Sequence, residues 1–232
     1  MINDQDRLRI EYAERERRLI GSDIYTVFNP ANLFMRQQRQ RDVLRILRQK
    51  HFFPLKGRKI LDVGCGGGGV LQEYLTFGAT PEYLLGCDLL PMRIRQARQV
   101  LPERLLLACA DGQYLPYASQ QFDLLIQYTV FSSILDDNLK ARLALGMLRV
   151  LKPGGMILWY DFWLNPTNPQ TRGIRPAEIR RLFPDCKYHY KRITLAPPLA
   201  RRLVPLSWGL ALFLEELRIF NTHYLVAIQP LP

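Results

Sequence analysis

The sequence has few histidines and cysteines, and its cysteines are scattered. Its 232 residues include three His and four Cys, and Cys65, Cys87, Cys109 and Cys186 form no C-x-x-C pair. Zinc sites and disulfide frameworks depend on such spacing, so neither is expected as the basis of the fold. Small buried thiols are the ordinary alternative. The sequence therefore predicts no metal centre.

An apolar leader and a long apolar run are also missing. The first twenty residues are densely charged, which speaks against a secretory signal. The longest nearly charge-free apolar run, Leu203 to Leu214, has 12 residues, against the roughly 20 that a membrane-spanning helix needs. We therefore expect a cytoplasmic protein without a transmembrane span.

Acidic residues are too few to balance the basic ones. The chain has 32 Lys and Arg against 21 Asp and Glu, a formal net charge of +11. This excess favours an anionic partner, which is a nucleic acid, a phosphorylated substrate or an anionic membrane face. Solubility is the simpler explanation, and charge alone does not choose among these.

Short apolar strands alternate with amphipathic helices through the middle of the chain. We predict helices at 68–77, 91–100 and 138–151, between strands at 59–63, 83–87, 104–109, 122–127 and 155–161. Apolar strands separated by helices indicate a parallel sheet that is covered on both faces. The sequence therefore predicts a doubly wound α/β fold.

Both ends of the chain differ from this pattern. Helices are expected over residues 1–20 and about 30–50, before the first strand. After the alternating part come a short helix near 176–182, a strand at 186–195 and an apolar stretch at 197–219. The final strand at 222–229 follows closely enough to pair antiparallel with the strand at 186–195.

A glycine-rich loop, DVGCGGGG at 62–69, follows the first strand and satisfies G-x-G-x-x-G. Glycines allow a ligand to approach the backbone closely. Asp88 ends the second strand, 24 residues after Gly64, where a carboxylate can hold a ribose diol. A nicotinamide dinucleotide would need the same arrangement, so this pair alone does not identify the ligand.

Two further carboxylates favour a cationic adenosyl ligand. Asp62 lies directly before the loop, where it would repel a pyrophosphate but attract an ammonium group. Asp111, after the third strand, can accept a hydrogen bond from an adenine amino group. Each residue alone is also explained as a loop cap or an Asx turn. The three carboxylates together favour the adenosyl ligand.

Four segments in the same order resemble the motifs of class I S-adenosylmethionine-dependent methyltransferases. They are ILDVGCGGGG, LLGCDLLP, ACADGQYLPYASQQFDLLI and RVLKPGGMILWYDF, within about residues 57–162. The resemblance implies a Rossmann-like seven-stranded sheet with an antiparallel last strand. It also implies S-adenosylmethionine as cofactor and S-adenosylhomocysteine as product. We expect a helical arm or cap at 1–56 and the methyltransferase domain at 57–232, with 197–219 as an apolar insertion.

The resemblance also implies roles for individual residues. The residues expected near the methionine part of the cofactor are Asp62, Gly64, Cys65, Gly66 and Gln127, with Asp62 beside the ammonium group. The residues expected near its adenosine are Asp88, Leu89, Asp111 and Gly112, with Asp88 on the ribose hydroxyls.

Methyl transfer from a sulfonium needs little more than geometry and the exclusion of water. A base is required only if the acceptor must lose a proton. Asp161, which ends the fifth strand, is the candidate base, and Tyr128, after the fourth, is a second catalytic candidate. Asp161 has a simpler alternative role, which is to cap or orient a neighbour. His189 and His223 are expected in the core or at the surface, although they could also face each other.

The acceptor is less defined. The segment 197–219, with Arg201 and Arg202 beside apolar residues, resembles an interfacial segment, which leaves peripheral contact with the inner membrane open. A core-packing helix explains it equally well. Three segments, WYDFWLNPTNP, RGIRPAEIRRLFP and TLAPPLARRL, resemble a bacterial subgroup associated with glycan or specialised-metabolite clusters. We therefore expect O-methylation, or less readily N-methylation, of a small molecule or a glycan- or lipid-linked acceptor.

Two alternatives stay open. The first is an RNA methyltransferase, which the arginine-rich helix at 30–50 permits. The [DNS]-P-P-[YF] segment of enzymes that methylate base nitrogens is missing, because the position after the fourth strand reads QYTV and NPTNP (165–169) follows the fifth. The second is a catalytically inactive partner protein with a methyltransferase fold.

Overall fold

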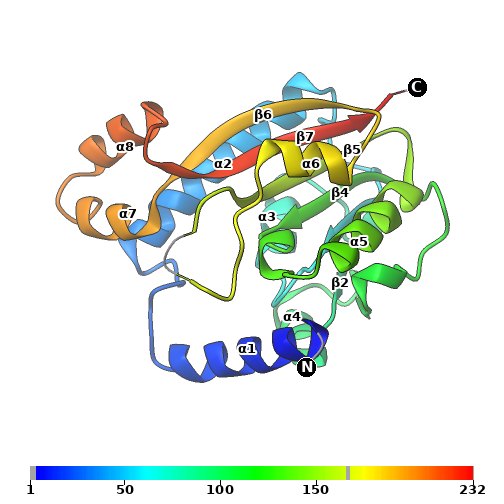
Figure 1. Ribbon diagram of the computed structural model, residues 1–232, viewed down its shortest axis with the longest axis horizontal. Coiled ribbons are helices and arrows are strands. Elements are labelled where there is room, and N and C mark those ends of the chain that lie inside the picture. The colour runs from blue at the N-terminus through cyan, green and yellow to red at the C-terminus, as the bar shows by residue number, and fades with distance from the viewer. Residues whose placement is uncertain (1–3, 166–167, 232) are drawn as a thin grey trace.

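The computed structural model describes residues 4–165 and 168–231. Its strands form one seven-stranded sheet in the order β3-β2-β1-β4-β5-β7-β6 (Figure 1). The strands are β1 (Ile60–Val63), β2 (Leu84–Asp88), β3 (Leu106–Cys109), β4 (Phe122–Tyr128), β5 (Leu151–Phe162), β6 (Cys186–Leu195) and β7 (Asn221–Pro230). The helices are α1 (Asp4–Leu19), α2 (Pro30–Gln49), α3 (Gly69–Thr76), α4 (Pro91–Val100), α5 (Asp137–Val150), α6 (Pro176–Leu182), α7 (Pro197–Leu203) and α8 (Trp208–Glu216).

The sheet topology confirms the predicted doubly wound fold. Strands β1 to β5 pair in parallel, while β7 lies antiparallel between β5 and β6. The strand order reverses beside β1, which has β2 on one side and β4 on the other. In such sheets a ligand binds outside the carboxyl ends of the strands at this reversal.

Alternate residues of the central strands enter two separate cores, because side chains alternate across a strand. Leu61 and Leu125 belong to one core, which α5 and α6 cover. Ile60 and Leu124 belong to the other, which α2, α3 and α4 cover. Helix α2 belongs to the expected arm at 1–56, yet it packs into the same core as the sheet. The division between this arm and a domain at 57–232 therefore stays a prediction.

Helix α1 is attached in a different way, mainly through polar groups. Leu8 is its one buried residue. Asp4 accepts hydrogen bonds from the amides of Leu135 and Asp136, and the Arg7 guanidinium donates to the carbonyl of Ser133. The helix occupies residues 4–19 of the predicted 1–20, and residues 1–3 lie outside the described part of the chain. In Figure 1 it lies apart from α2, across a linker without helix or strand.

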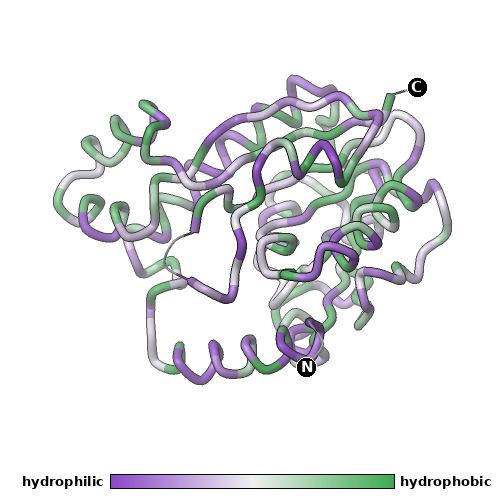
Figure 2. The backbone as a smooth tube through the Cα atoms, in the orientation of Figure 1, coloured by the Kyte–Doolittle hydropathy of each residue, from purple (hydrophilic) through white to green (hydrophobic). Residues whose placement is uncertain are grey.

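The apolar stretch at 197–219 folds into α7 and α8, which pack on one side and are exposed on the other. Ala200 and Ala211 are buried against Phe34 and Leu195. The Glu215 carboxylate accepts the amide of Thr194 at 3.0 Å, which fixes α8 to β6. The outer side chains are exposed, among them Leu206, Leu210 and Phe213, and Figure 2 shows the apolar residues along α8. Within the described residues, no helix has the length and apolarity to cross a bilayer.

The close packing behind the glycine loop predicts that Gly86→Ala destabilises the protein. A Cβ at Gly86 would lie 2.8 Å from Leu71 Cδ1 and 2.9 Å from Cys65 Sγ. We expect a loss of about 1–3 kcal/mol in the free energy of unfolding, measured by urea denaturation. Gly209→Ala in α8 is the control, because a Cβ there meets nothing within 4 Å. Equal urea midpoints for the two variants would contradict the prediction.

Candidate functional site

The glycine loop after β1 is fixed to the end of β2. The amides of Gly64 and Cys65 donate to the Cys87 carbonyl at 2.8 and 3.0 Å. The amide of Gly66 donates to Asp88 Oδ2 at 2.9 Å. Gly64 has a φ of 76°, and a Cβ there would clash with Val130 Cγ2. Only glycine fits this turn, so the loop passes close against the segment after β4.

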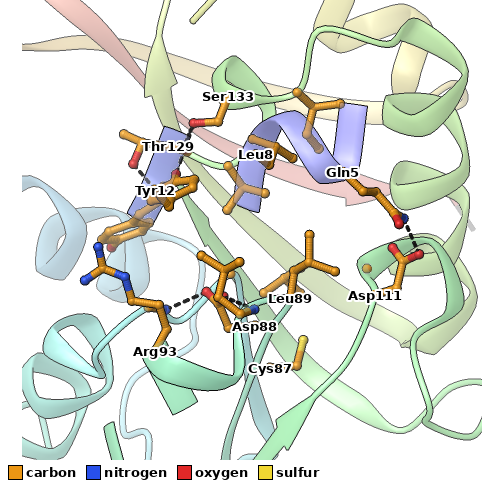
Figure 3. Close-up of a pocket in the computed structure, with 18 of the residues that line it drawn as sticks. Gln5, Leu8, Tyr12, Cys87, Asp88, Leu89, Arg93, Asp111, Thr129 and Ser133 are labelled. Carbon is orange, nitrogen blue, oxygen red and sulfur yellow. Dashed lines mark hydrogen bonds between the residues drawn. The ribbon is translucent and has the colours of Figure 1, made fainter. Parts of the chain in front are cut away.

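A cavity of about 470 Å³ opens over this loop, at the carboxyl ends of the central strands (Figure 3). A Cβ at Gly66 would meet nothing within 4 Å, so the backbone there is free to receive a ligand. The residues predicted for the site that line this first cavity are Gly64, Gly66, Asp88, Leu89, Asp111, Gly112 and Tyr128. The predicted residues that do not line it are Asp62, Cys65, Gln127 and Asp161.

Asp62 lies buried under the cavity wall. It is 1% exposed, and its Oδ2 is buried without a hydrogen-bond partner among the described residues. Burial, with the nearby charges of Asp88 and Glu73, raises the pKa of Asp62 to about 8, although Arg39 opposes the shift. The next two residues, Val63 and Gly64, line the cavity. A cationic group bound there would compensate the carboxylate.

Gln127, at the end of β4, is the second buried polar side chain with an unused atom. Its Oε1 accepts the amide of Val130 at 3.1 Å. Its Nε2 is buried and has no hydrogen-bond partner among the described residues. Buried polar groups in proteins are nearly always hydrogen-bonded, so the unused amide is an exception, but Gln127 is fully buried and its predicted contact with the methionine part of the cofactor stays a prediction.

Asp88 and Asp111 are hydrogen-bonded by the loops that they shape. Asp88 also accepts the amide of Leu90 at 2.9 Å, and burial raises its pKa. Asp111 accepts the amide of Gln113 at 3.0 Å, which is the Asx-type cap that was the simpler alternative. Its other oxygen accepts Gln5 Nε2 at 2.5 Å (Figure 3). Contact with ribose and adenine therefore stays a prediction for these two residues.

Helix α1 forms a wall of the cavity, which the sequence pattern did not predict. Leu8, Tyr12, Arg15 and Leu19 line it. Their spacing of i, i+4, i+7 and i+11 places them on one face of a helix. This spacing is visible in the sequence, but three apolar residues among many charges gave a weak signal.

A second cavity of about 840 Å³ adjoins the first. Its walls are α1, the segment after β5, the start of α7 and the start of β7. The residues that line both cavities are Tyr12, Arg15, Leu19, Tyr25, Thr129 and Ser133. These side chains therefore form the boundary between the two cavities.

Thr129 and Ser133 form the polar part of this junction. Thr129 has a φ of 59°, which is costly for a residue other than glycine. Its amide donates to the Tyr160 carbonyl at 2.7 Å, which fixes it at the end of β4. Ser133 Oγ lies 3.3 Å from the Tyr12 hydroxyl. Strain of this kind concentrates at ligand sites.

The two catalytic candidates have different surroundings. Tyr128 lines the first cavity, its hydroxyl is 3.4 Å from that of Tyr74, and burial raises its pKa. Asp161 is 1% exposed and accepts the amides of Ser132 at 3.1 Å and Phe162 at 2.8 Å. Burial raises the pKa of Asp161 to about 6 against these hydrogen bonds. Its role as a base stays a prediction, and the geometry favours the positioning role.

The two histidines of the last strands do not face each other. His223 lies across from Ile193 and His189 from Ala227. His223 is buried and stacks on Tyr160, with ring centroids 4.6 Å apart. Burial lowers the pKa of His223 to about 3. His189 is exposed. Of the two expected placements, His223 therefore has the one in the core and His189 the one at the surface.

Comparison with known proteins agrees with this geometry. Residues 61–159 match the family model described as a methyltransferase domain. The chain is 34% identical over 122 residues to the phthiotriol/phenolphthiotriol dimycocerosates methyltransferase of Mycobacterium leprae, which covers 49% of this chain and 40% of that protein. It is 28% identical to the ubiquinone biosynthesis O-methyltransferase of Pseudomonas fluorescens, with 60% and 59% covered. The chain thus spans less than two thirds of both relatives.

A solved structure shows the same fold. The S-adenosylmethionine-dependent methyltransferase of Mesorhizobium loti superposes with a TM-score of 0.58 at 19% identity, over 80% of this chain and 96% of that one. The chain therefore contains a region similar to a methyltransferase domain, and it shares the fold of this S-adenosylmethionine-dependent methyltransferase. The cofactor expected with such a domain is S-adenosylmethionine, and its product is S-adenosylhomocysteine. The open backbone at Gly66 and the unpaired oxygen of Asp62 suit the amino-acid end of such a ligand.

The high pKa of Asp62 predicts that S-adenosylhomocysteine binding depends on pH. The ionised carboxylate binds the ammonium group, so below pH 8 binding must release the Asp62 proton. Affinity should rise by up to about tenfold per pH unit from pH 6 and level off near pH 8. The raised pKa also means that ionisation of Asp62 destabilises the folded state. Without ligand, the free energy of unfolding should therefore fall as the pH rises from about 4 to about 8.

Calorimetry in buffers of different ionisation enthalpy measures the proton release. Asp62→Asn should bind the ligand more weakly and without this pH dependence. Asp185→Asn, at an exposed carboxylate outside both cavities, should behave like the parent protein. A parent protein that binds without releasing a proton at pH 7 would contradict the account.

Proposed function

We propose that this protein transfers a methyl group from S-adenosylmethionine to an oxygen atom of a small molecule or a glycan- or lipid-linked acceptor. The observation that carries the proposal is the junction of the two cavities at Thr129 and Ser133. The first cavity suits the cofactor, and the second offers a separate space for the acceptor. Nitrogen is the less favoured acceptor atom.

Each part of the site has a role in this proposal. When bound, the cofactor supplies a methyl group on a positively charged sulfur. Gly64, Gly66 and Asp88 hold the cofactor, and α1 keeps water away from both cavities, which favours transfer. Thr129 and Ser133 orient the acceptor at the junction. Asp161 holds the turn before Ser133 through the Ser132 amide.

One relative supports oxygen as the acceptor atom, and the names of several relatives support a small-molecule or lipid acceptor. The Pseudomonas relative is named as an O-methyltransferase of ubiquinone biosynthesis, and the mycobacterial one is named for phthiotriol and phenolphthiotriol dimycocerosates. Sterol C-methyltransferases are also among the matched proteins. The bacterial glycan or specialised-metabolite subgroup stays a prediction.

We also propose a cytoplasmic protein that touches the inner membrane through residues 197–219. The outer side chains of this segment, such as Leu206 and Phe213, are exposed at 81% and 60%. The neighbouring Arg202 is exposed and suits an anionic bilayer surface. The inner side of the same segment packs on α2 and β6.

The two alternatives, an RNA methyltransferase and a catalytically inactive partner protein, have less support. The arginines of α2 are largely engaged within the chain, since Arg36 and Arg39 both pair with Glu73 and Arg45 pairs with Asp42. This pairing weighs against α2 as an RNA-binding face. The unpaired oxygen of Asp62 beside an open cavity weighs against an inactive partner protein.

Methyl transfer to cell fractions tests the proposal. Incubation with S-adenosylmethionine labelled in its methyl group should label the organic extract of the producing cells and leave purified RNA unlabelled. Asp88→Ala should lose most of this label and bind S-adenosylhomocysteine at least about tenfold more weakly, because its hydrogen bond to Gly66 shapes the loop. Label in RNA would favour the RNA alternative. Ligand binding without transfer to any fraction would favour the inactive partner.

A further inference from the structure

Arg201, in the wall of the second cavity, has a buried donor atom without a partner among the described residues. The residue is partly buried on α7 and lines this cavity but not the first. Its Nε is buried and has no hydrogen-bond partner among the described residues, and no described carboxylate forms an ion pair with it. A buried group of this kind needs an acceptor.

Arg15 supplies a second cation on the opposite element. It lies on α1, lines both cavities and is partly buried. Its guanidinium carbon lies 5.1 Å from the centre of the Tyr25 ring, and no described carboxylate pairs with it. Stacking on a ring leaves the edge of a guanidinium free to donate hydrogen bonds.

The other charges of the cavity do not cancel these two cations. Arg18 pairs with Glu11 at 2.7 Å, which removes one charge of each sign. Glu14 remains, and it is an exposed residue that solvent screens. The walls therefore keep a positive excess at Arg15 and Arg201.

The same cavity also has exposed apolar lining. Tyr25, Leu164, Ile219 and Phe220 line it, and each of these large side chains is between 46% and 67% exposed. Exposed apolar side chains favour contact with an apolar ligand or an interface. The cavity thus combines cationic and apolar lining, which is the complement of an anionic amphiphile.

We propose that the second cavity binds the oxyanion group of an amphiphilic acceptor, a phosphate or carboxylate, through Arg201 and Arg15. The inference rests on the proposed function, since it narrows the class of acceptor for the same site. Arginine suits both groups because its planar fork can donate two parallel hydrogen bonds to them. The apolar chain of the acceptor lies along Ile219 and Phe220. The hydroxyl to be methylated reaches the junction at Thr129.

Binding of short amphiphiles tests this. The probes are decyl phosphate, decanoate and decanol, each below its aggregation threshold, titrated into the protein saturated with S-adenosylhomocysteine. Inorganic phosphate is a fourth probe. We expect decyl phosphate or decanoate to bind at least about tenfold more tightly than decanol. Inorganic phosphate should bind more weakly than decyl phosphate because it lacks the chain.

Two neighbouring arginines of α7 give a matched pair of variants. Arg201→Gln should lose the preference for the anionic probes and keep its affinity for S-adenosylhomocysteine. Arg202→Gln removes the same charge from an exposed position outside both cavities and should keep the preference. Circular dichroism melting checks that both variants are folded.

Several results would overturn the proposal. Equal affinity for decanol and the anionic probes would show that no oxyanion site exists. If Arg201→Gln and Arg202→Gln lost the preference for the anionic probes equally, the general positive charge of the surface would explain that preference, as it would explain binding to an anionic bilayer. If inorganic phosphate bound as tightly as decyl phosphate, the apolar chain would contribute nothing to binding, and an amphiphilic acceptor would be ruled out. A protein that fails to bind S-adenosylhomocysteine would refute the proposed function instead, and the probes titrated without it would still report on the oxyanion site.

Discussion

The site depends on the attachment of the glycine loop to the end of β2. The Cys87 carbonyl and the Asp88 carboxylate together accept the amides of Gly64, Cys65 and Gly66. These hydrogen bonds hold the backbone in a turn where Gly64 must have a positive φ. The turn leaves the backbone open at Gly66 and places Asp62 beneath the cavity wall. A buried carboxylate with an unpaired oxygen is unstable by itself, and the arrangement is explained if a cationic ligand completes it.

The sheet and α1 enclose the two cavities from opposite sides. The sheet supplies the rigid side, from the glycine loop to Thr129 after β4. Helix α1 supplies the other side through Tyr12 and Arg15, and it is held by hydrogen bonds to Ser133, Leu135 and Asp111 rather than by a large apolar face. Contacts of this kind open at a lower free-energy cost than a packed core.

Much of the fold could be predicted from the sequence because it depends on local patterns. The helix at 91–100 and the strand at 186–195 have the predicted bounds, since each is delimited by turn residues and strong periodicity. Strand β5 begins earlier than predicted, at Leu151, because Leu151 pairs with Phe122 before a register shift. Such a pairing depends on the partner strand and leaves no local signal.

The site was predictable only in part, for the same reason. The residues at the strand ends, such as Asp88 and Asp111, follow from the topology. The position of α1 over the cavity, the contact of Gln5 with Asp111 and the unpaired Arg201 depend on contacts between residues far apart in the chain. The burial of Asp161 away from both cavities also depends on such long-range contacts. Spacing within a strand does not reveal whether a side chain reaches a cavity or a backbone amide.

The central claim is that one cavity holds the methyl donor and the adjoining cavity holds the acceptor. A crystal structure with S-adenosylhomocysteine bound tests it most directly. The account predicts the ammonium group beside Asp62 and the sulfur at the junction near Thr129 and Ser133, facing the second cavity. A sulfur that faces away from this junction, or a ligand that leaves the second cavity cut off from it, would contradict the account.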